Sequence, residues 1–107
     1  MEPTPHEAFK ALGDPTRLKL FERLCREGEL TVGGLTEGSG VSQPAVSKHL
    51  AVLKRSRLVT DRREGREARY RVRPEGLSIV VDWLGHYAAF WPDRFDRLED
   101  LLNRMDQ

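Results

Sequence analysis

The sequence predicts a mainly helical α+β fold that contains one small β-hairpin. Three observations support this prediction. Apolar residues recur every three or four positions over most of the 107 residues, which is the spacing of one face of an α-helix. A Gly-Ser-Gly turn at 38–40 separates two of these helical segments. Apolar and polar residues alternate at 68–72, just after a second turn at Glu64-Gly65, and this alternation is typical of a strand in a hairpin.

The length and composition indicate one folded domain, covering residues 1–107. A chain of 107 residues can build one hydrophobic core but not two. No apolar run approaches the roughly 20 residues of a membrane span, and the N-terminus lacks the basic start and apolar stretch of a signal peptide. The single Cys25 cannot form an internal disulfide. We therefore expect a cytoplasmic protein without a membrane partner.

Two helices are predicted at the N-terminus. The first covers residues 6–12 and ends at Gly13. Asp14 is a suitable N-cap for the second, and Pro15 suits its first position. This second helix runs to about residue 27. Its core-facing side is predicted from apolar residues at helical spacing: Leu18, Leu20, Phe21, Leu24 and Cys25. On this interpretation Cys25 is a small core residue, with a redox role as the alternative.

Residues 32–55 are predicted to form a helix–turn–helix. A short helix covers 32–37 and a longer one covers 42–55. Ser42 can cap the longer helix, whose first turn tolerates Pro44. A narrow apolar stripe along this helix consists of Val46, Leu50 and Leu53. The remaining positions carry side chains that can lie against a polar ligand: Gln43, Ser47, Lys48, His49 and Lys54.

A basic β-hairpin is predicted at 58–73, with its tip at Glu64-Gly65. Three arginines stand at or near the tip: Arg62, Arg63 and Arg66. Residues 45–73 hold ten Lys or Arg against three Asp or Glu, a local net charge of +7, whereas the rest of the chain has a net charge of −6. Such segregation of charge marks a surface that binds a polyanion.

A helix, a turn, a second helix and a basic hairpin follow one another in the order of a winged helix–turn–helix. In that fold the second helix enters the DNA major groove, so double-stranded DNA is the predicted partner. Gln43, Ser47 and Lys48 are assigned to base edges, because they fall in the first two turns. The residues assigned mainly to phosphates are Ser42, His49, Arg55, Arg62, Arg63 and Arg66.

The C-terminal segment 75–107 is helical and carries both tryptophans. Pro92 either kinks one helix or starts another. One small domain has too little surface to cover these apolar residues, which favours dimerisation through the terminal helices. Two alternatives remain: the segment folds back on its own core, or it forms a pocket for an apolar effector. The predicted dimer interface consists of Phe9, Leu12, Trp83, Tyr87, Phe90, Trp91, Phe95 and Leu98.

Four stretches carry a resemblance to a known family: FKALGDPTRLKLFERL, ELTVGGL, VSQPAVSKHLAVLKRSRLV and REGREARYRV. Together they resemble the ArsR-type (ArsR/SmtB) winged-helix transcriptional regulators, over residues 8–74. The resemblance implies a homodimer that represses transcription by occupying a palindromic operator and that dimerises through its first and last helices. The C-terminal run resembles a metal-independent branch of the family.

The chain departs from the metal-sensing members of that family. Thr31-Val32-Gly33 stands where thiolate sensors have Cys-Val-Cys, and soft metals need thiolates. Members that bind zinc between the last helices use Asp, His and Glu at set intervals, whereas only Asp82 and His86 lie in that region here. A four-ligand zinc site needs more donors. We therefore expect no metal site and no cofactor, and the sequence identifies no effector.

Two other classes of function were considered. A winged-helix module that binds a protein instead of DNA has no general need for a +7 segment aligned with a polar helix face. An enzyme is disfavoured, because the sequence contains no nucleophile–base set, no glycine-rich phosphate loop and no cluster of metal ligands.

Overall fold

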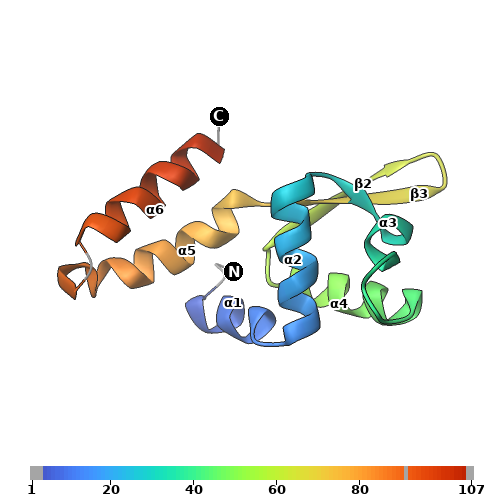
Figure 1. Ribbon diagram of the computed structural model, residues 1–107, viewed down its shortest axis with the longest axis horizontal. Coiled ribbons are helices and arrows are strands. Elements are labelled where there is room, and N and C mark those ends of the chain that lie inside the picture. Colours follow the sequence, from blue (N-terminus) through green and yellow to red (C-terminus); the bar gives the residue numbers. More distant parts are fainter. Residues whose placement is uncertain (1–3, 91, 106–107) are drawn as a thin grey trace.

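The computed structural model describes residues 4–90 and 92–105, except for the side chains at 92 and 95. In chain order the described elements are α1 (Pro5–Leu12), α2 (Pro15–Glu27), β1 (Leu30–Thr31), α3 (Val32–Thr36), α4 (Gln43–Arg55), β2 (Val59–Glu64), β3 (Glu67–Val72), α5 (Pro74–Gly85), the 3-10 helix η1 (Ala88–Phe90) and α6 (Pro92–Met105). The shape is elongated, 46 × 30 × 27 Å. Helices α5 and α6 lie side by side at one end, and the hairpin projects from the other (Figure 1). The predicted mainly helical fold with a small hairpin is therefore confirmed.

The helix starts follow from capping residues that the sequence places there. The Asp14 carboxylate accepts a hydrogen bond from the backbone N–H of Arg17 at 3.0 Å, and the Ser42 hydroxyl accepts one from Ala45 at 3.3 Å. Each side chain satisfies a donor that the first helical turn leaves free. Pro15 directly follows Asp14, as expected, and is the first residue of α2. Helix α4 starts at Gln43, directly after its cap Ser42.

The core is built from α2, α3, α4 and the base of the hairpin. Its fully buried leucines and valines are Leu20, Leu24, Leu35, Val46, Leu50, Leu53, Leu58 and Val59. Ala8 and Ala11 let α1 approach closely and complete the cluster. The three apolar residues predicted for the buried stripe of α4 are all among these residues, so α4 presents its opposite face outward.

The predicted burial of Leu18 and Cys25 is wrong. Leu18 is 38% exposed and Cys25 is also exposed. An α-helix turns about 100° per residue, and the buried face of α2 is centred on Leu20 and Leu24. Leu18 and Cys25 lie together on the flank of that face. Partial desolvation of the thiol and the nearby Glu22 carboxylate raise the pKa of Cys25, so the thiolate that redox chemistry needs is disfavoured.

The hairpin belongs to a three-stranded antiparallel sheet with strand order β1-β3-β2. Gly65 has a φ of +65° at the tip, a backbone conformation that glycine adopts without strain. Strand β1, where Leu30 pairs with Tyr70 and Thr31 pairs with Arg69, was not predicted. A strand of two residues is too short to show an alternating pattern. It ties the wing, β2 and β3, to the entrance of α3.

Gly76 allows α5 to start directly against the turn between α4 and β2. A Cβ atom at this position would lie 3.1 Å from the Leu58 Cα and would collide with the Arg57 carbonyl oxygen. The same turn receives a hydrogen bond from the backbone N–H of Arg73 to the Leu58 carbonyl, at 2.9 Å. Close backbone approach at Gly76 therefore seats the C-terminal helices on the winged part of the molecule.

The C-terminal segment forms two helices, and α6 starts at Pro92. Helix α5 packs against α1, where the rings of Phe9 and Trp83 meet edge to face with centroids 5.2 Å apart. Much of the apolar surface stays uncovered: Tyr87 is 43% exposed and Phe90 is 73% exposed. Trp91 lies outside the described residues. Among the described helices, none has the length and hydropathy required to cross a membrane.

Candidate nucleic-acid interface

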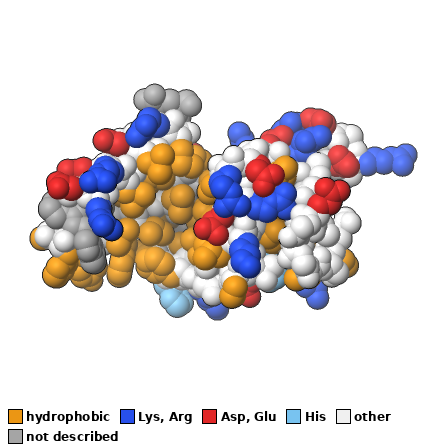
Figure 2. Space-filling view, viewed as in Figure 1, with side chains coloured by type: hydrophobic (Ala, Val, Ile, Leu, Met, Phe, Trp, Pro, Cys, Tyr) orange, Lys and Arg blue, Asp and Glu red, His pale blue; other side chains and the backbone are white. Residues whose placement is uncertain are grey.

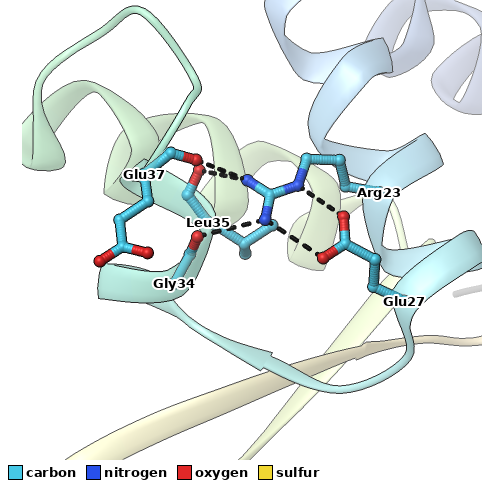
Figure 3. A network of polar contacts seen from close by, with 5 residues as sticks. All are labelled: Arg23, Glu27, Gly34, Leu35 and Glu37. Carbon is cyan, nitrogen blue, oxygen red and sulfur yellow. Dashed lines mark hydrogen bonds and ion pairs between the residues drawn. The ribbon is translucent and has the colours of Figure 1, made fainter.

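Helix α3 is held in place by Arg23 of α2 (Figure 3). The Arg23 Nη1 donates to the carbonyl oxygens of Leu35 at 3.0 Å and Glu37 at 2.9 Å. Its Nη2 donates to the carbonyl of Gly34 at 3.3 Å. Glu27 holds the guanidinium from the other side, with its carboxylate 2.9 Å from Nε. Arg23 thus satisfies carbonyls at the C-terminal end of a five-residue helix that has little stability of its own.

The other end of α3 and the turn to α4 are fixed by hydroxyl groups. The Thr31 hydroxyl accepts a hydrogen bond from the backbone N–H of Gly34 at 3.0 Å, so Thr31 caps α3. In the turn, the Ser39 hydroxyl donates to the Thr36 carbonyl at 2.8 Å and accepts from the Val41 N–H at 3.2 Å. These contacts set the angle at which α4 leaves α3.

The exposed side of α4 carries four of the nine residues assigned to DNA. Gln43, Ser47 and Lys48 lie exposed in its first two turns, and Arg55 is exposed at its end. His49 differs, because it is half-buried and its Nδ1 lies 3.5 Å from the Arg17 Nη1. His49 therefore faces α2 more than it faces solvent.

Arg17 joins three helices next to His49. Its Nε donates to the Ala11 carbonyl at 2.6 Å and its Nη2 donates to the Lys10 carbonyl at 3.3 Å. These bonds satisfy the C-terminal end of α1, while the guanidinium also reaches α4. The contacts of Arg17 fix the position of α4 relative to α1. Helix α1 borders the exposed aromatic residues.

The wing is attached to α4 by an ion pair between Lys54 and Asp61. The Lys54 Nζ lies 2.8 Å from the Asp61 Oδ1, and the hydrogen bond to this carboxylate raises the pKa of Lys54. Lys54 was predicted to lie on the polar face of the helix, and its contact with Asp61 was not predicted. The pair reduces the positive charge that Lys54 offers to a ligand and holds β2 beside the last turn of α4.

The three wing arginines have different surroundings. Arg63 and Arg66 are exposed, and within residues 4–90 and 92–105 neither forms an ion pair. Arg62 instead pairs with Glu29 at 2.7 Å and with Glu64 at 2.9 Å. Hydrogen bonding to Arg62 lowers the pKa of Glu29. The sequence predicted the same role for all three arginines and gave no sign of the Glu29 contact, because no local pattern links residues 33 positions apart.

Within the described part of the chain, no group of three or more His, Cys, Asp or Glu residues is arranged to hold a metal ion. Asp82 and His86 are both exposed near the end of α5. Thr31, which stands at the first thiolate position of the metal sensors, has a structural role as the cap of α3.

Comparison with known proteins agrees with this geometry. The family model described as bacterial regulatory protein, arsR family, matches residues 14–61. The arsenic resistance transcriptional regulator ArsR1 of Pseudomonas putida is 44% identical over 81 residues, which are 76% of this chain and 60% of that protein. The transcriptional repressor SdpR of Bacillus subtilis is 33% identical, over 74% of this chain and 87% of that protein.

A solved structure gives the same result for the whole fold. The ArsR-like transcriptional regulator from Rhodococcus sp. RHA1 superposes with a TM-score of 0.71 at 30% sequence identity, over 91% of each chain. The chain therefore belongs to the ArsR family of bacterial regulatory proteins, which are DNA-binding transcriptional regulators and not enzymes.

Proposed function

We propose that this chain is a homodimeric repressor that acts in the cytoplasm and binds a palindromic operator. Each protomer places α4 in a major groove and the wing along the phosphate backbone. The main support is one observation: Gln43, Ser47 and Lys48 form the exposed polar side of α4, and the Lys54–Asp61 pair holds the wing with its arginines beside it. A surface of this composition fits the edge of a DNA duplex.

The first two turns of α4 supply the base contacts in this proposal. Residues near the N-terminal end of a recognition helix reach base edges most directly. A glutamine amide can pair with adenine through two hydrogen bonds, and a lysine ammonium can donate to guanine. Gln43 and Lys48 are assigned these roles, with Ser47 as a contact that tolerates several bases.

Three of the proposed phosphate contacts come from arginines that form no ion pair within the described residues. Arg55, Arg63 and Arg66 are exposed and free of ion pairs within the described residues. Each can release a counterion when it neutralises a phosphate. Ser42 contributes its hydroxyl proton, since its oxygen already accepts the Ala45 N–H. His49 contributes through its half-buried ring at the edge of α4.

The exposed apolar face supplies the dimer interface. Figure 2 shows apolar side chains gathered over α5 and α1, away from the charged wing. A soluble monomer rarely exposes a large continuous apolar patch, and a second copy of the chain is the occupant that the operator symmetry requires. Two α4 helices would then enter successive major grooves, about 34 Å apart. Of the residues predicted for the interface, Phe9, Trp83, Tyr87 and Phe90 are exposed, whereas Leu12 and Leu98 are half-buried; Trp91 and the Phe95 side chain lie outside the description.

Two substitutions test the division between base and phosphate contacts. Gln43→Ala is expected to relax the preference for particular operator positions, at a cost of about 1–3 kcal/mol in operator binding. Arg63→Ala is expected to weaken binding to operator and random duplex alike. It should also reduce the salt slope by about 0.9 for each bound protomer. Fluorescence anisotropy over a salt series, with operator and random duplex, measures both effects.

The same measurements can contradict the proposed roles. If Gln43→Ala weakens operator and random DNA equally, Gln43 does not read a base. If the wild-type protein has the mass of a monomer and binds all duplexes alike, the proposed dimeric repressor is wrong. A winged-helix module for a protein partner would then be the better description.

A second candidate function is supported by a groove on the apolar face. Trp83, Leu84, Tyr87 and Phe90 line a hollow of about 430 Å³, which is within the usual range for small-molecule sites. A small apolar effector bound there would reduce operator affinity by favouring a dimer in which the two α4 helices no longer match the half-sites. In a Trp91→Phe protein, quenching of Trp83 by such a molecule with no change in operator affinity would argue against this function.

A further inference from the structure

The wing contains two neighbouring arginines that lie on opposite faces of the sheet. Successive side chains of a strand point to opposite faces, so Asp61 and Arg63 share one face of β2 and Arg62 lies on the other. The Asp61 carboxylate contacts Lys54 of α4, which identifies its face as the one beside the proposed recognition helix. Arg62 contacts Glu29 in the turn between α2 and β1. Arg63 is therefore on the α4 side and Arg62 is on the rear side.

Arg62 is held by several contacts at once. Its Nε lies 3.1 Å from both carboxylate oxygens of Glu29, and its Nη2 lies 2.7 Å from one of them. Its Nη1 lies 2.9 Å from Glu64. A forked contact of this kind fixes the orientation of the guanidinium. With Lys54 on the other face, β2 is held by ion pairs from both sides.

We infer that Glu29 and Arg62 are positioning residues that fix the direction of the wing, and that Arg62 does not neutralise a phosphate. This inference rests on the proposed function and refines it, because it separates Arg62 from Arg63 and Arg66. The Arg62 guanidinium is already paired with Glu29, and it shares Glu64 with Arg69, so it adds little to counterion release when DNA arrives. Removal of Arg63 should therefore reduce the salt dependence of operator binding, and removal of Arg62 should not.

Three variants test the inference against Arg63→Ala as the matched control on the neighbouring position. Arg62→Ala is expected to leave the salt slope of operator binding unchanged and to lower operator affinity about two- to fivefold. Arg62→Lys should behave like Arg62→Ala, because lysine keeps the positive charge but lacks the planar guanidinium that contacts both carboxylate oxygens of Glu29. Glu29→Gln should also weaken operator binding, although it makes the protein more positive and simple attraction would tighten it.

The ion pair between Glu29 and Arg62 provides a second measurement. Hydrogen bonding from Arg62 lowers the pKa of Glu29, and carboxylate chemical shifts can follow this pKa with and without operator DNA. The pKa should stay low in the complex if Arg62 remains on Glu29. The pKa should rise in the Arg62→Ala protein, although the nearby Arg69 and Arg71 continue to lower it.

The outcomes separate the inference from the proposed function. Three results would each overturn the inference alone. The salt slope could fall in Arg62→Ala as it does in Arg63→Ala, or Glu29→Gln could tighten operator binding. The third is a Glu29 pKa that rises on DNA binding as far in the wild type as in the Arg62→Ala protein, since phosphates alone raise the pKa of a nearby carboxylate. A wild-type protein that selects no operator would overturn the proposed function, and the positioning role would fall with it.

Discussion

Asp14 couples the stability of α2 to pH through one hydrogen bond. The backbone N–H of Arg17 donates to its carboxylate, and this bond lowers the pKa of Asp14, with the nearby charges of His49 and Arg17 acting in the same direction. A carboxyl group with a lowered pKa in the folded state binds fewer protons there than in the unfolded chain. Folding stability therefore rises with pH between the two pKa values.

Asp14→Asn isolates this contribution, because asparagine caps a helix about as well as aspartate but carries no charge. We expect the variant to be less stable than the wild type at pH 7. The difference should shrink as the pH falls below about 3.9, the unfolded value for aspartate, and through the lower folded pKa. Urea unfolding at a series of pH values measures the difference. An equal gap at every pH would mean that the charge contributes nothing.

Two features of single residues could not be predicted from the sequence: the exposure of Cys25 and the difference between Arg62 and Arg63. The assignment of Cys25 to the core depended on which flank of α2 the other elements cover, and the helical period alone does not determine that. The opposite surroundings of Arg62 and Arg63 depend on the register of β2 with its neighbours and on the position of Glu29. Contacts between residues distant in sequence leave no local pattern, so these features are visible only in the three-dimensional structure.

At the scale of elements, α3 depends on its neighbour α2. A helix of five residues cannot be stable alone, and Arg23 supplies three hydrogen bonds to carbonyls at its C-terminal end. The Arg23 side chain is 23% exposed, so water reaches these carbonyls only in part when the arginine is removed. The position of α4 follows from α3, since the Ser39 turn joins the two helices.

Arg23→Met should therefore loosen the helix–turn–helix. We expect a loss of about 1–2 kcal/mol in the free energy of unfolding, with faster hydrogen exchange in α3 than in α2. Arg26→Met on the same helix is the matched control, and its cost should stay within about 0.5 kcal/mol. Equal losses in the two variants would show that the Arg23 contacts to α3 carry no special weight.

The elements differed in how far the sequence could predict them. Helix α4 was predictable because a cap, a proline in the first turn and an apolar stripe all coincide within a few residues, and the hairpin was predictable from Glu64-Gly65 and the alternation after it. Strand β1 was missed because two residues show no period. The break at Pro92 stayed open because proline fits both a kink and a helix start.

At the scale of the molecule, the excess of positive charge and the exposed aromatic groups lie on different segments. Residues 45–73, in α4 and the wing, have a net charge of +7. The exposed aromatic groups belong to the terminal segments, where α6 also carries arginine, aspartate and glutamate side chains (Figure 2). Gly76 joins the two parts through a close backbone contact, and Arg17 joins α1 to α4. A dimer formed at the apolar end therefore determines how far apart the two α4 helices lie, which is the distance that an operator must match.

Phe90→Glu tests this dependence, because Phe90 is 73% exposed and a charge there would have to be buried in the proposed interface. We expect a folded monomer by light scattering and circular dichroism. Its affinity for a two-half-site operator should fall about a hundredfold or more, since the second half-site no longer benefits from a linked partner. Affinity for a single half-site should not change.

Leu18→Glu is the matched control, because Leu18 is also an exposed apolar residue, 38% accessible, but lies on α2 and does not line the apolar groove. It should leave the dimer mass and operator affinity unchanged. A Phe90→Glu protein that remains dimeric would place the interface elsewhere. A monomer that still binds the full operator as tightly as the wild type would instead show that the two α4 helices do not need a fixed separation, and the palindromic operator would lose its geometric basis.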